Sequence, residues 1–336
     1  MGSTVFSGEV WTNVHPEIMK QLSLINAVPV DGKVGHDSYT MHARQLMKAQ
    51  FDEPVWITET INGTAANILA LKCLLKPWSS IICADVTHIN THECGAAEFN
   101  LGAKILSVPA PAGKLTPSMV REVLRKNQAY HLMPTVLVLT QPTEYGVLYS
   151  VPELTELAAM AHENGMEVYI DGARLPFALE ALGIGLKEMI EGPDIDAFSF
   201  GGTKCGAMFG EMIVFRREKD RDHLQYLQKQ TLQHFDKSKF LGIQLEYLLE
   251  NENWRRLAGD MNHMATFLAE KLARKGILPV YPVDTNMVFC RLSKAQMEKV
   301  CSVFDLHYWD AAAEVVRLCC SHETTIEDVE KLEELL

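Results

Sequence analysis

The chain has 336 residues and is acidic, with 43 Asp and Glu against 31 Lys and Arg and a formal net charge of −12. Because nucleic-acid binding needs a basic face, this charge argues against a nucleic-acid-binding protein. Hydrophobic residues make up 47% of the chain and charged residues 22%, which is typical of a globular protein with a substantial core, and no apolar run is long enough to span a membrane.

The first half of the chain is predicted to alternate between short apolar strands and helices. Residues 1–14 are expected to be extended, and Pro16 predicts a helix over 16–26, followed by a loop at 29–37 and a helix at 38–49. The next predicted segments are strands at 55–58, 79–84, 103–108, 135–140 and 167–171, and helices within 61–75, 91–100, 116–127 and 151–165. Such alternation predicts a mostly parallel sheet that is covered by helices on both faces.

The second half continues with a strand at 211–215, a polar helical stretch at 217–250 and a helix at 253–275. Strands near 286–292 and 314–319 and helices near 294–304 and 325–336 suit a small α+β domain. We therefore expect an α/β fold with a large domain at 15–250 and a small C-terminal domain at 251–336, which the N-terminal segment 1–14 joins.

Lys204 lies in FSFGGTKCGAMFGE (198–211), where an apolar strand ends in glycines. Desolvation among small neighbours disfavours the ammonium form, so Lys204 is a candidate amine nucleophile near neutral pH. Schiff-base formation with a carbonyl, such as the aldehyde of pyridoxal 5′-phosphate (PLP), needs such an amine. The alternative is a surface lysine in a glycine-rich turn.

Asp171 ends the strand in EVYIDGAR (167–174), at the edge of the sheet where α/β proteins bind ligands. A carboxylate there would keep the pyridine nitrogen of PLP protonated. For Asp171 alone, helix capping or pairing with Arg174 is the better explanation. The combination of Asp171 and Lys204, each ending a strand, favours a cofactor site.

Gly63 and Thr64, in INGTAAN, follow a strand and open a helix. Free N–H groups at a helix start, beside a hydroxyl, bind phosphate well. This signal is weak by itself because many strand–helix turns are similar, and the chain has neither a Walker loop nor a GxGxxG pattern.

His88 and His92 lie four residues apart in THINTHECG. On a helix they would share a face and suit a metal, but no third ligand is in view and we expect no metal site. The other interpretations are structural hydrogen bonds or stacking of an imidazole on an aromatic cofactor. His88, which comes just after a strand, is better placed for stacking than His92.

Gln141 and Glu144, in TQPTEYG, end another strand and therefore point toward the same edge of the sheet. Glu144 suits either a general base or a hydrogen-bonding partner of its own loop.

The eight cysteines are scattered and form no CxxC pair. The N-terminus lacks a basic segment followed by an apolar one. We therefore expect reduced thiols and a cytoplasmic protein.

Several motifs occur together in order: INGTAANILAL, THINTHECGA, GKLTP, TQPTEYGVLY, IDGAR, SFGGTKCGAMFGE and KQTLQHFDKSKF. In this combination the chain resembles the threonine aldolase family of PLP enzymes, which have the aminotransferase-like fold called fold type I. The resemblance runs from about His15 to the C-terminus.

The resemblance implies a PLP site. Lys204 would form the Schiff base, Asp171 would pair with the pyridine nitrogen, His88 would stack on the ring, and Gly63 and Thr64 would hold the phosphate. Further cofactor contacts are expected from Gln141, Arg174 and Thr203.

The resemblance also implies a substrate site and an assembly. Arg174 and Arg317 match the arginines that hold the substrate carboxylate, and Glu144 lies at a position that contacts the substrate. Lys229, and with it Lys237, matches positions that reach into a neighbouring subunit's site. A homodimer or homotetramer with its active site at the subunit interface is therefore expected.

The chain departs from the family pattern at several positions. A Ser-Asp-Asn or Asn-Asp-Tyr run is common where this chain has Gly8, Glu9 and Val10, beside the expected substrate. A usual tyrosine is Val34, and a usual asparagine after the lysine is Cys205.

The expected activity is cleavage of β-hydroxy-α-amino acids such as L-threonine, L-allo-threonine or phenylserine to glycine and an aldehyde, with Glu144 or His88 as the base. The altered segment 8–10 keeps a PLP-dependent β-eliminating lyase or an amino-acid racemase as the alternative. A non-catalytic relative is a third interpretation, against which the intact Lys204 and Asp171 argue.

Overall fold

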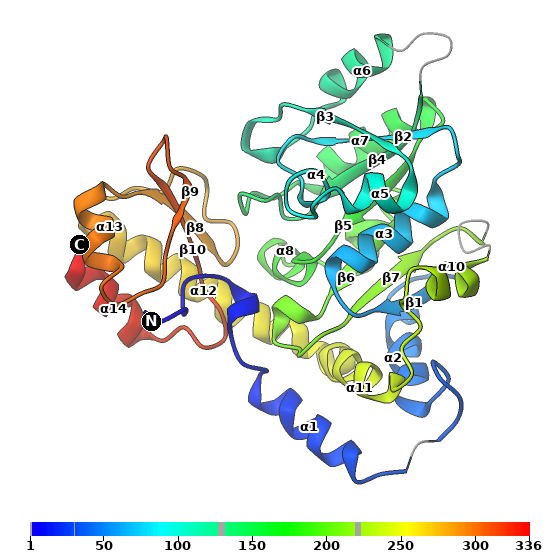
Figure 1. Ribbon diagram of the computed structural model, residues 1–336, viewed down its shortest axis with the longest axis horizontal. Coiled ribbons are helices and arrows are strands. Elements are labelled where there is room, and N and C mark those ends of the chain that lie inside the picture. The colour runs from blue at the N-terminus through cyan, green and yellow to red at the C-terminus, as the bar shows by residue number, and fades with distance from the viewer. Residues whose placement is uncertain (1, 30, 127–131, 219–222) are drawn as a thin grey trace.

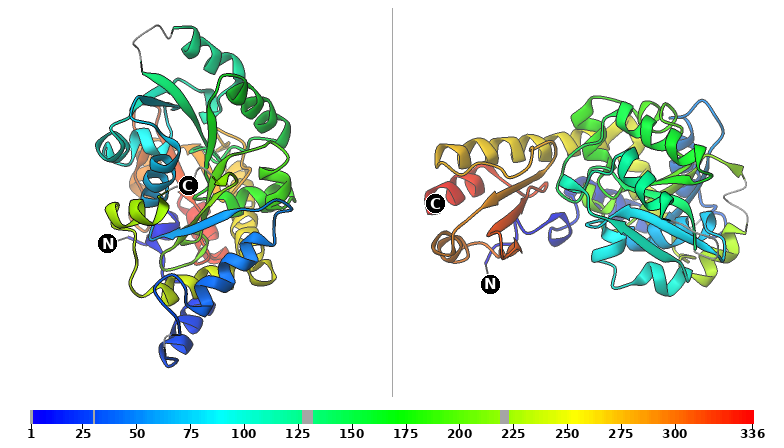
Figure 2. Two further views of the ribbon diagram at one scale, coloured as in Figure 1. Left: turned by 90° about the vertical axis from the view of Figure 1, so that its right-hand side faces the viewer. Right: turned by 90° about the horizontal axis from the view of Figure 1, so that it is seen from above.

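The computed structural model describes residues 2–29, 31–126, 132–218 and 223–336. A larger part is built around a seven-stranded sheet and a smaller part around a three-stranded sheet (Figure 1). Helix α12 (Asn253–Arg274) connects the two parts (Figure 2).

The larger sheet has the strand order β1-β7-β6-β5-β4-β2-β3. Its strands are β1 (Trp56–Thr60), β2 (Ser79–Ala84), β3 (Lys104–Val108), β4 (Met133–Thr140), β5 (Glu167–Asp171), β6 (Ala197–Gly201) and β7 (Glu211–Phe215). The pairs from β3 to β6 are parallel, whereas β7 is antiparallel to both of its neighbours. The predicted mostly parallel sheet is confirmed, and β7 is the exception.

Helices cover both faces of this sheet (Figure 1). They are α1 (Pro16–Asn26), α2 (Ser38–Lys48), α3 (Gly63–Leu74), α4 (His88–Thr91), α5 (Ala96–Leu101), α6 (Pro117–Arg125), α7 (Val151–Glu163), α8 (Leu175–Leu182), α9 (Leu186–Ile190), α10 (Leu224–Gln230) and α11 (Ser238–Leu249). Along β2, Ile82 and Ala84 join the core that contains α7, α8 and α11, whereas Ile81 and Cys83 join the core beneath α3. Strands such as β2 and β7 are buried along their whole length, and their sequences accordingly contain long apolar runs.

The smaller part consists of β8 (Met287–Arg291), β9 (Tyr308–Asp310) and β10 (Val315–Cys319), with α13 (Lys294–Val300) and α14 (Ile326–Leu335). The N-terminal segment packs here: Ser3 N–H donates to the carbonyl of Val303, and Phe6 lies in this core against Phe304. We propose that the two domains divide near residue 250 and that the first residues of the chain belong to the smaller domain.

Three sequence predictions were wrong in detail. The helix expected over 91–100 is broken by left-handed backbone at Cys94 and Gly95, so α4 and α5 are separate. The helical stretch expected over 217–250 contains two helices, because the chain turns at Leu232, where φ is 63°; positions 219–222 lie outside the described residues. The expected extended segment 1–14 contains a 3-10 turn, η1 (Glu9–Trp11), and β9 was not predicted.

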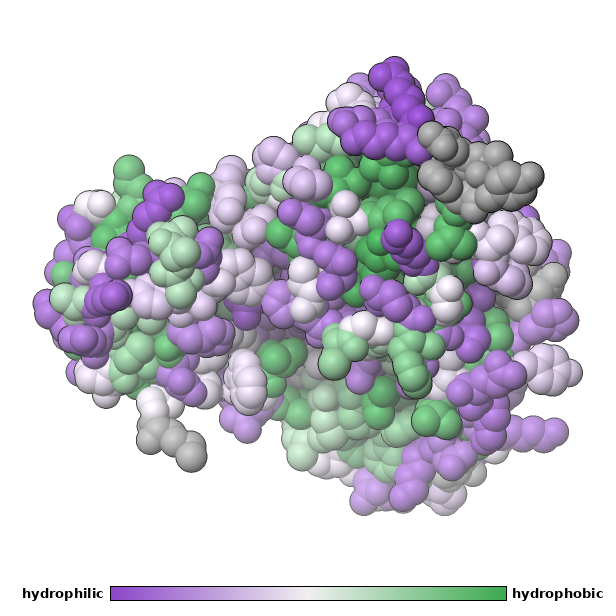
Figure 3. Space-filling model, turned by 45° about the horizontal axis from the view of Figure 1, so that its top comes forward, coloured by the Kyte–Doolittle hydropathy of each residue, from purple (hydrophilic) through white to green (hydrophobic). Residues whose placement is uncertain are grey.

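On the face drawn in Figure 3, hydrophilic and hydrophobic residues are intermixed over both parts, and hydrophobic residues gather on the larger part. Within the ranges that the structure covers, no helix is both long and apolar enough to cross a membrane.

Candidate active site

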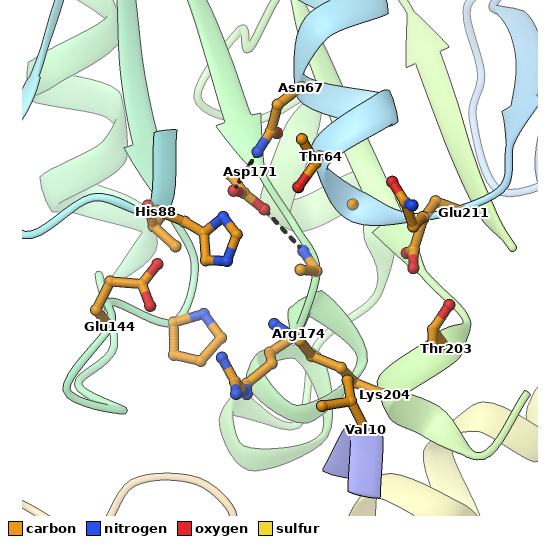
Figure 4. A pocket seen from close by; sticks show the side chains of 15 residues that line it. Val10, Thr64, Asn67, His88, Glu144, Asp171, Arg174, Thr203, Lys204 and Glu211 are labelled. Atoms are coloured by element: carbon orange, nitrogen blue, oxygen red, sulfur yellow. Dashed lines mark hydrogen bonds between the residues drawn. The ribbon is translucent and has the colours of Figure 1, made fainter. Parts of the chain in front are cut away.

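A cavity of about 250 Å³ lies where the carboxyl ends of the parallel strands meet (Figure 4). Its walls come from η1, from the start of α3, from the ends of β4 and β5, from the loops after β2, β4, β5 and β6, and from the first residue of β7. The lining residues are Val10, Asn62, Gly63, Thr64, Asn67, His88, Thr140, Pro142, Glu144, Asp171, Ala173, Arg174, Thr203, Lys204 and Glu211. Most of the predicted site residues are therefore brought together at one edge of the sheet.

Lys204 follows β6 in a short 3-10 turn, η3 (Thr203–Cys205). Burial and the nearby charge of Arg174 lower the pKa of its ammonium group, which outweighs the opposing effect of the surrounding carboxylates. Lys204 forms no hydrogen bond or ion pair with any described residue. Its side chain lines the cavity as an amine that deprotonates more readily than an ordinary lysine.

Asp171 is buried at the end of β5. Its carboxylate accepts hydrogen bonds from Asn67 Nδ2 at 2.9 Å and from the backbone N–H of Ala173 at 3.1 Å (Figure 4). These two hydrogen bonds fix the direction in which the carboxylate points.

His88 is tied to the same network through Glu93. His88 Nδ1 lies 2.8 Å from Glu93 Oε1, which also accepts from Asn67 Nδ2 at 2.8 Å. Burial alone would lower the pKa of His88, but the hydrogen bond with Glu93 and the carboxylates of Asp171 and Glu144 outweigh it and raise that pKa. Sequence reasoning missed Asn67 and Glu93; one helical turn separates Asn67 from Gly63, and this spacing was the available signal.

Glu211 is a further buried carboxylate that the sequence did not reveal. Because β7 runs antiparallel, it begins at the edge where the parallel strands end, and this brings Glu211 beside Thr203 (Figure 4). Burial raises the pKa of Glu211 to about 7, although its carboxylate accepts a hydrogen bond from the N–H of Gly202.

Glu9 forms an ion pair with Arg174, and the sequence did not predict this pair. Arg174 Nε and Nη2 donate to the two Glu9 carboxylate oxygens at 2.6 and 3.0 Å. Burial alone would raise the pKa of Glu9, but the charge and hydrogen bonds of Arg174 hold it well below its usual range. The sequence segment 8–10 thus contributes a buried ion pair at the site.

A second cavity of about 640 Å³ adjoins the first and shares with it Val10, His88, Glu144, Arg174 and Lys204. Its outer wall contains Arg317, whose guanidinium group lies 4.8 Å from the centre of the Trp309 ring. The rings of His88, His92 and Trp309 stack in succession, with centroid distances of 5.7 and 5.5 Å.

Two predicted residues lie elsewhere. Gln141 is fully buried and exchanges hydrogen bonds with the backbone of Tyr149, and it lines neither cavity. Lys229 is exposed on α10 and does not line the cavities of its own chain. Among the described residues, no group of three or more His, Cys, Asp and Glu side chains could hold a metal ion.

A family model described as β-eliminating lyase matches residues 11–295. The chain belongs to the β-eliminating lyase family. The low specificity L-threonine aldolase of Pseudomonas aeruginosa is 33% identical over 330 residues, which cover 97% of this chain and 95% of that protein. The predicted enzyme class, a lyase, is thereby confirmed.

The structural comparisons confirm the predicted fold type I of this β-eliminating lyase family member. The Leishmania major threonine aldolase superposes with a TM-score of 0.93 at 28% identity, over 99% of this chain and 98% of that one. An aspartate aminotransferase from Thermus thermophilus superposes with a TM-score of 0.72 at 17% identity, over 100% of this chain and 89% of that one. The latter likeness concerns the fold alone.

Proposed function

We propose that this chain is a PLP-dependent aldolase that cleaves β-hydroxy-α-amino acids to glycine and an aldehyde. The observation that carries the proposal is the cavity in which Lys204, with its lowered pKa, faces the buried carboxylate of Asp171. The named activity of the Pseudomonas aeruginosa and Leishmania major relatives supports the same reaction.

The residues of the cavity fit PLP. The N–H groups of Gly63 and Thr64, at the start of α3, make no hydrogen bond within the described residues and suit a phosphate. Asp171 suits the pyridine nitrogen, the half-exposed ring of His88 suits stacking, and Lys204 suits the aldehyde. Bound PLP would supply an electron sink for the carbanion that forms when the Cα–Cβ bond breaks.

Cleavage requires a base for the β-hydroxyl proton, and the structure favours Glu144 over His88. Glu144 lines both cavities, and its carboxylate makes no hydrogen bond within the described residues. His88 already engages Glu93 through Nδ1, and this hydrogen bond holds the ring in one orientation, which suits stacking better than proton transfer. We therefore propose that Glu144 removes the proton and that His88 stacks on the cofactor.

Glu144→Gln is expected to lower kcat by about 10²- to 10³-fold, because the amide cannot accept the hydroxyl proton. His88→Phe keeps a flat ring for stacking and is expected to lower kcat by less than about tenfold. Aldehyde release under saturating substrate measures both, and glycine binding to each variant controls for an intact site. A severe loss for His88→Phe together with an active Glu144→Gln variant would assign the base to His88 instead.

The proposed function is tested by mixing the purified protein and PLP with L-threonine, L-allo-threonine and phenylserine while recording absorbance and released aldehyde. An absorbance change with aldehyde and glycine in equal amounts is the expected result. Pyruvate and ammonia, or a D-amino acid, in place of aldehyde would contradict it and indicate elimination or racemisation.

We further propose a cytoplasmic homodimer or homotetramer. All eight cysteines are free, which suits a reducing compartment. An apolar groove lined by Met19, Met208, Phe235 and neighbouring residues is open on this chain, and Leu232 is 88% exposed. Lys229 and Lys237 are exposed nearby in sequence and are available to a neighbouring subunit's site. Sedimentation equilibrium measures the assembly, and a monomer would contradict it.

A further inference from the structure

In the ion pair between Glu9 and Arg174, hydrogen bonds to Glu9 occupy one edge of the guanidinium group. Nε and Nη2 of Arg174 each donate to a different oxygen of Glu9, at 2.6 and 3.0 Å. The side chains of Glu9 and Arg174 are 2% and 10% exposed. Asn286 Nδ2 donates to Glu9 Oε1 at 2.8 Å, so a third group holds the carboxylate in place.

Glu9 therefore occupies the place on the guanidinium group of Arg174 that the carboxylate of a ligand would otherwise take. A guanidinium group binds a carboxylate through two parallel hydrogen bonds along one edge, and Glu9 already occupies the Nε/Nη2 edge of Arg174. Arg174 lines the cavity and its Nη1 group takes no part in the bonds to Glu9, but the positive charge of the guanidinium group is matched by Glu9. Displacing Glu9 would leave a buried carboxylate without its cation, which is costly.

Arg317 has the opposite environment. It lines the second cavity together with Lys204 and Glu144, and the Glu9–Arg174 pair lines the same cavity. Its Nη2 donates to the carbonyl of Ser7 at 3.4 Å, and its plane lies over the Trp309 ring. Within the described ranges, no carboxylate lies within ion-pairing distance of Arg317, so its charge is unmatched at the cavity wall.

The Trp309 ring also directs Arg317. Trp309 stacks against His92 on one side and meets the edge of Tyr145 on another. A guanidinium group that rests on a packed ring keeps its plane while its edge stays open to a planar anion. The site therefore has one paired and one available arginine.

We propose that Arg317 alone binds the substrate carboxylate and that Glu9 holds Arg174 out of substrate recognition. The inference rests on the proposed amino-acid substrate. Glu9 lies in segment 8–10, where the chain departs from the common family pattern. By occupying Arg174, Glu9 would leave Arg317 as the one arginine that binds the substrate carboxylate.

The test compares L-alanine with ethylamine, its analogue without a carboxylate, as ligands of the PLP-loaded enzyme. L-Alanine has no β-hydroxyl group, so its binding requires no carbon–carbon cleavage. Absorbance and calorimetric titrations give the two dissociation constants, and their ratio measures recognition of the carboxylate. This ratio does not depend on turnover.

Arg317→Gln is expected to reduce the preference for L-alanine by at least about tenfold. The double variant Glu9→Gln/Arg174→Gln removes both charges of the buried pair together and is expected to keep the preference within about threefold. Loss of the preference in the double variant, with Arg317→Gln unaffected, would overturn the inference. Thermal unfolding checks that each variant is folded.

If the double variant does not fold, a crystal structure of the wild-type enzyme with L-alanine decides the question. A carboxylate on Arg317, with Glu9 still on Arg174, supports the inference, whereas a carboxylate on Arg174 with Glu9 displaced overturns it. A wild-type enzyme that binds L-alanine and yet releases no aldehyde from any β-hydroxy-amino acid would refute the proposed aldolase activity. The binding titrations and the crystal structure would still decide which arginine binds the carboxylate.

Discussion

Replacing Lys204 by alanine is expected to lower aldolase activity by about 10³-fold or more, as does the loss of the covalent nucleophile in other enzymes. The variant is also expected to lose the absorbance band that PLP gives when it is bound to a lysine. The reason is that Lys204 is the amine that lines the cavity beside Asp171 and has a lowered pKa. Titration with PLP, followed by an aldehyde assay, measures both effects.

Two further variants make this result specific. Lys204→Arg keeps a positive charge but presents no amine for a Schiff base, so it is expected to be as inactive as the alanine variant. Lys104→Ala alters an exposed lysine on β3 and is expected to behave as the wild type. If Lys204→Ala retained both the band and the activity, the assignment of the cofactor lysine would be wrong.

Gly172→Ala is expected to destabilise the protein by about 3 kcal/mol or more and to impair PLP binding. A Cβ atom at Gly172 would lie 1.9 Å from the carbonyl oxygen of Ser199, so the ends of β5 and β6 would have to separate. Asp171 is the last residue of β5 and Lys204 follows β6, so the distance between Asp171 and Lys204 would change as the strands separate. Denaturant unfolding and PLP titration measure the two effects.

Gly185→Ala is the matched control. Its Cβ would meet no atom within 4 Å, and its φ of −96° is open to alanine. We expect a change in the free energy of unfolding of less than about 0.5 kcal/mol. Equal stability of the two glycine variants would show that the strand ends can separate without cost and would contradict the role assigned to Gly172.

Much of the larger fold was predictable because it depends on local patterns. The strands at 79–84, 167–171 and 211–215 and the helix at 16–26 have the predicted bounds. Continuous apolar runs mark strands that are buried on both faces, and a proline in the first turn marks a helix start. The breaks at Cys94 and Leu232 were not predictable, since non-glycine residues rarely adopt left-handed backbone and carry no clear signal for it.

The residues of the candidate site also form two groups, those that sequence patterns indicated and those that only the folded structure brings together. The sequence by itself indicated that Lys204 and Asp171 each lie at the end of an apolar strand, because the order of strands and turns can be read along the chain and parallel strands end at one edge. Only the tertiary structure decided that Glu9 pairs with Arg174, which is 165 positions away. Only the structure likewise decided that the antiparallel strand β7 places Glu211 in the same cavity. The physical reason is that a buried charge needs a partner in space, and packing rather than sequence spacing selects that partner.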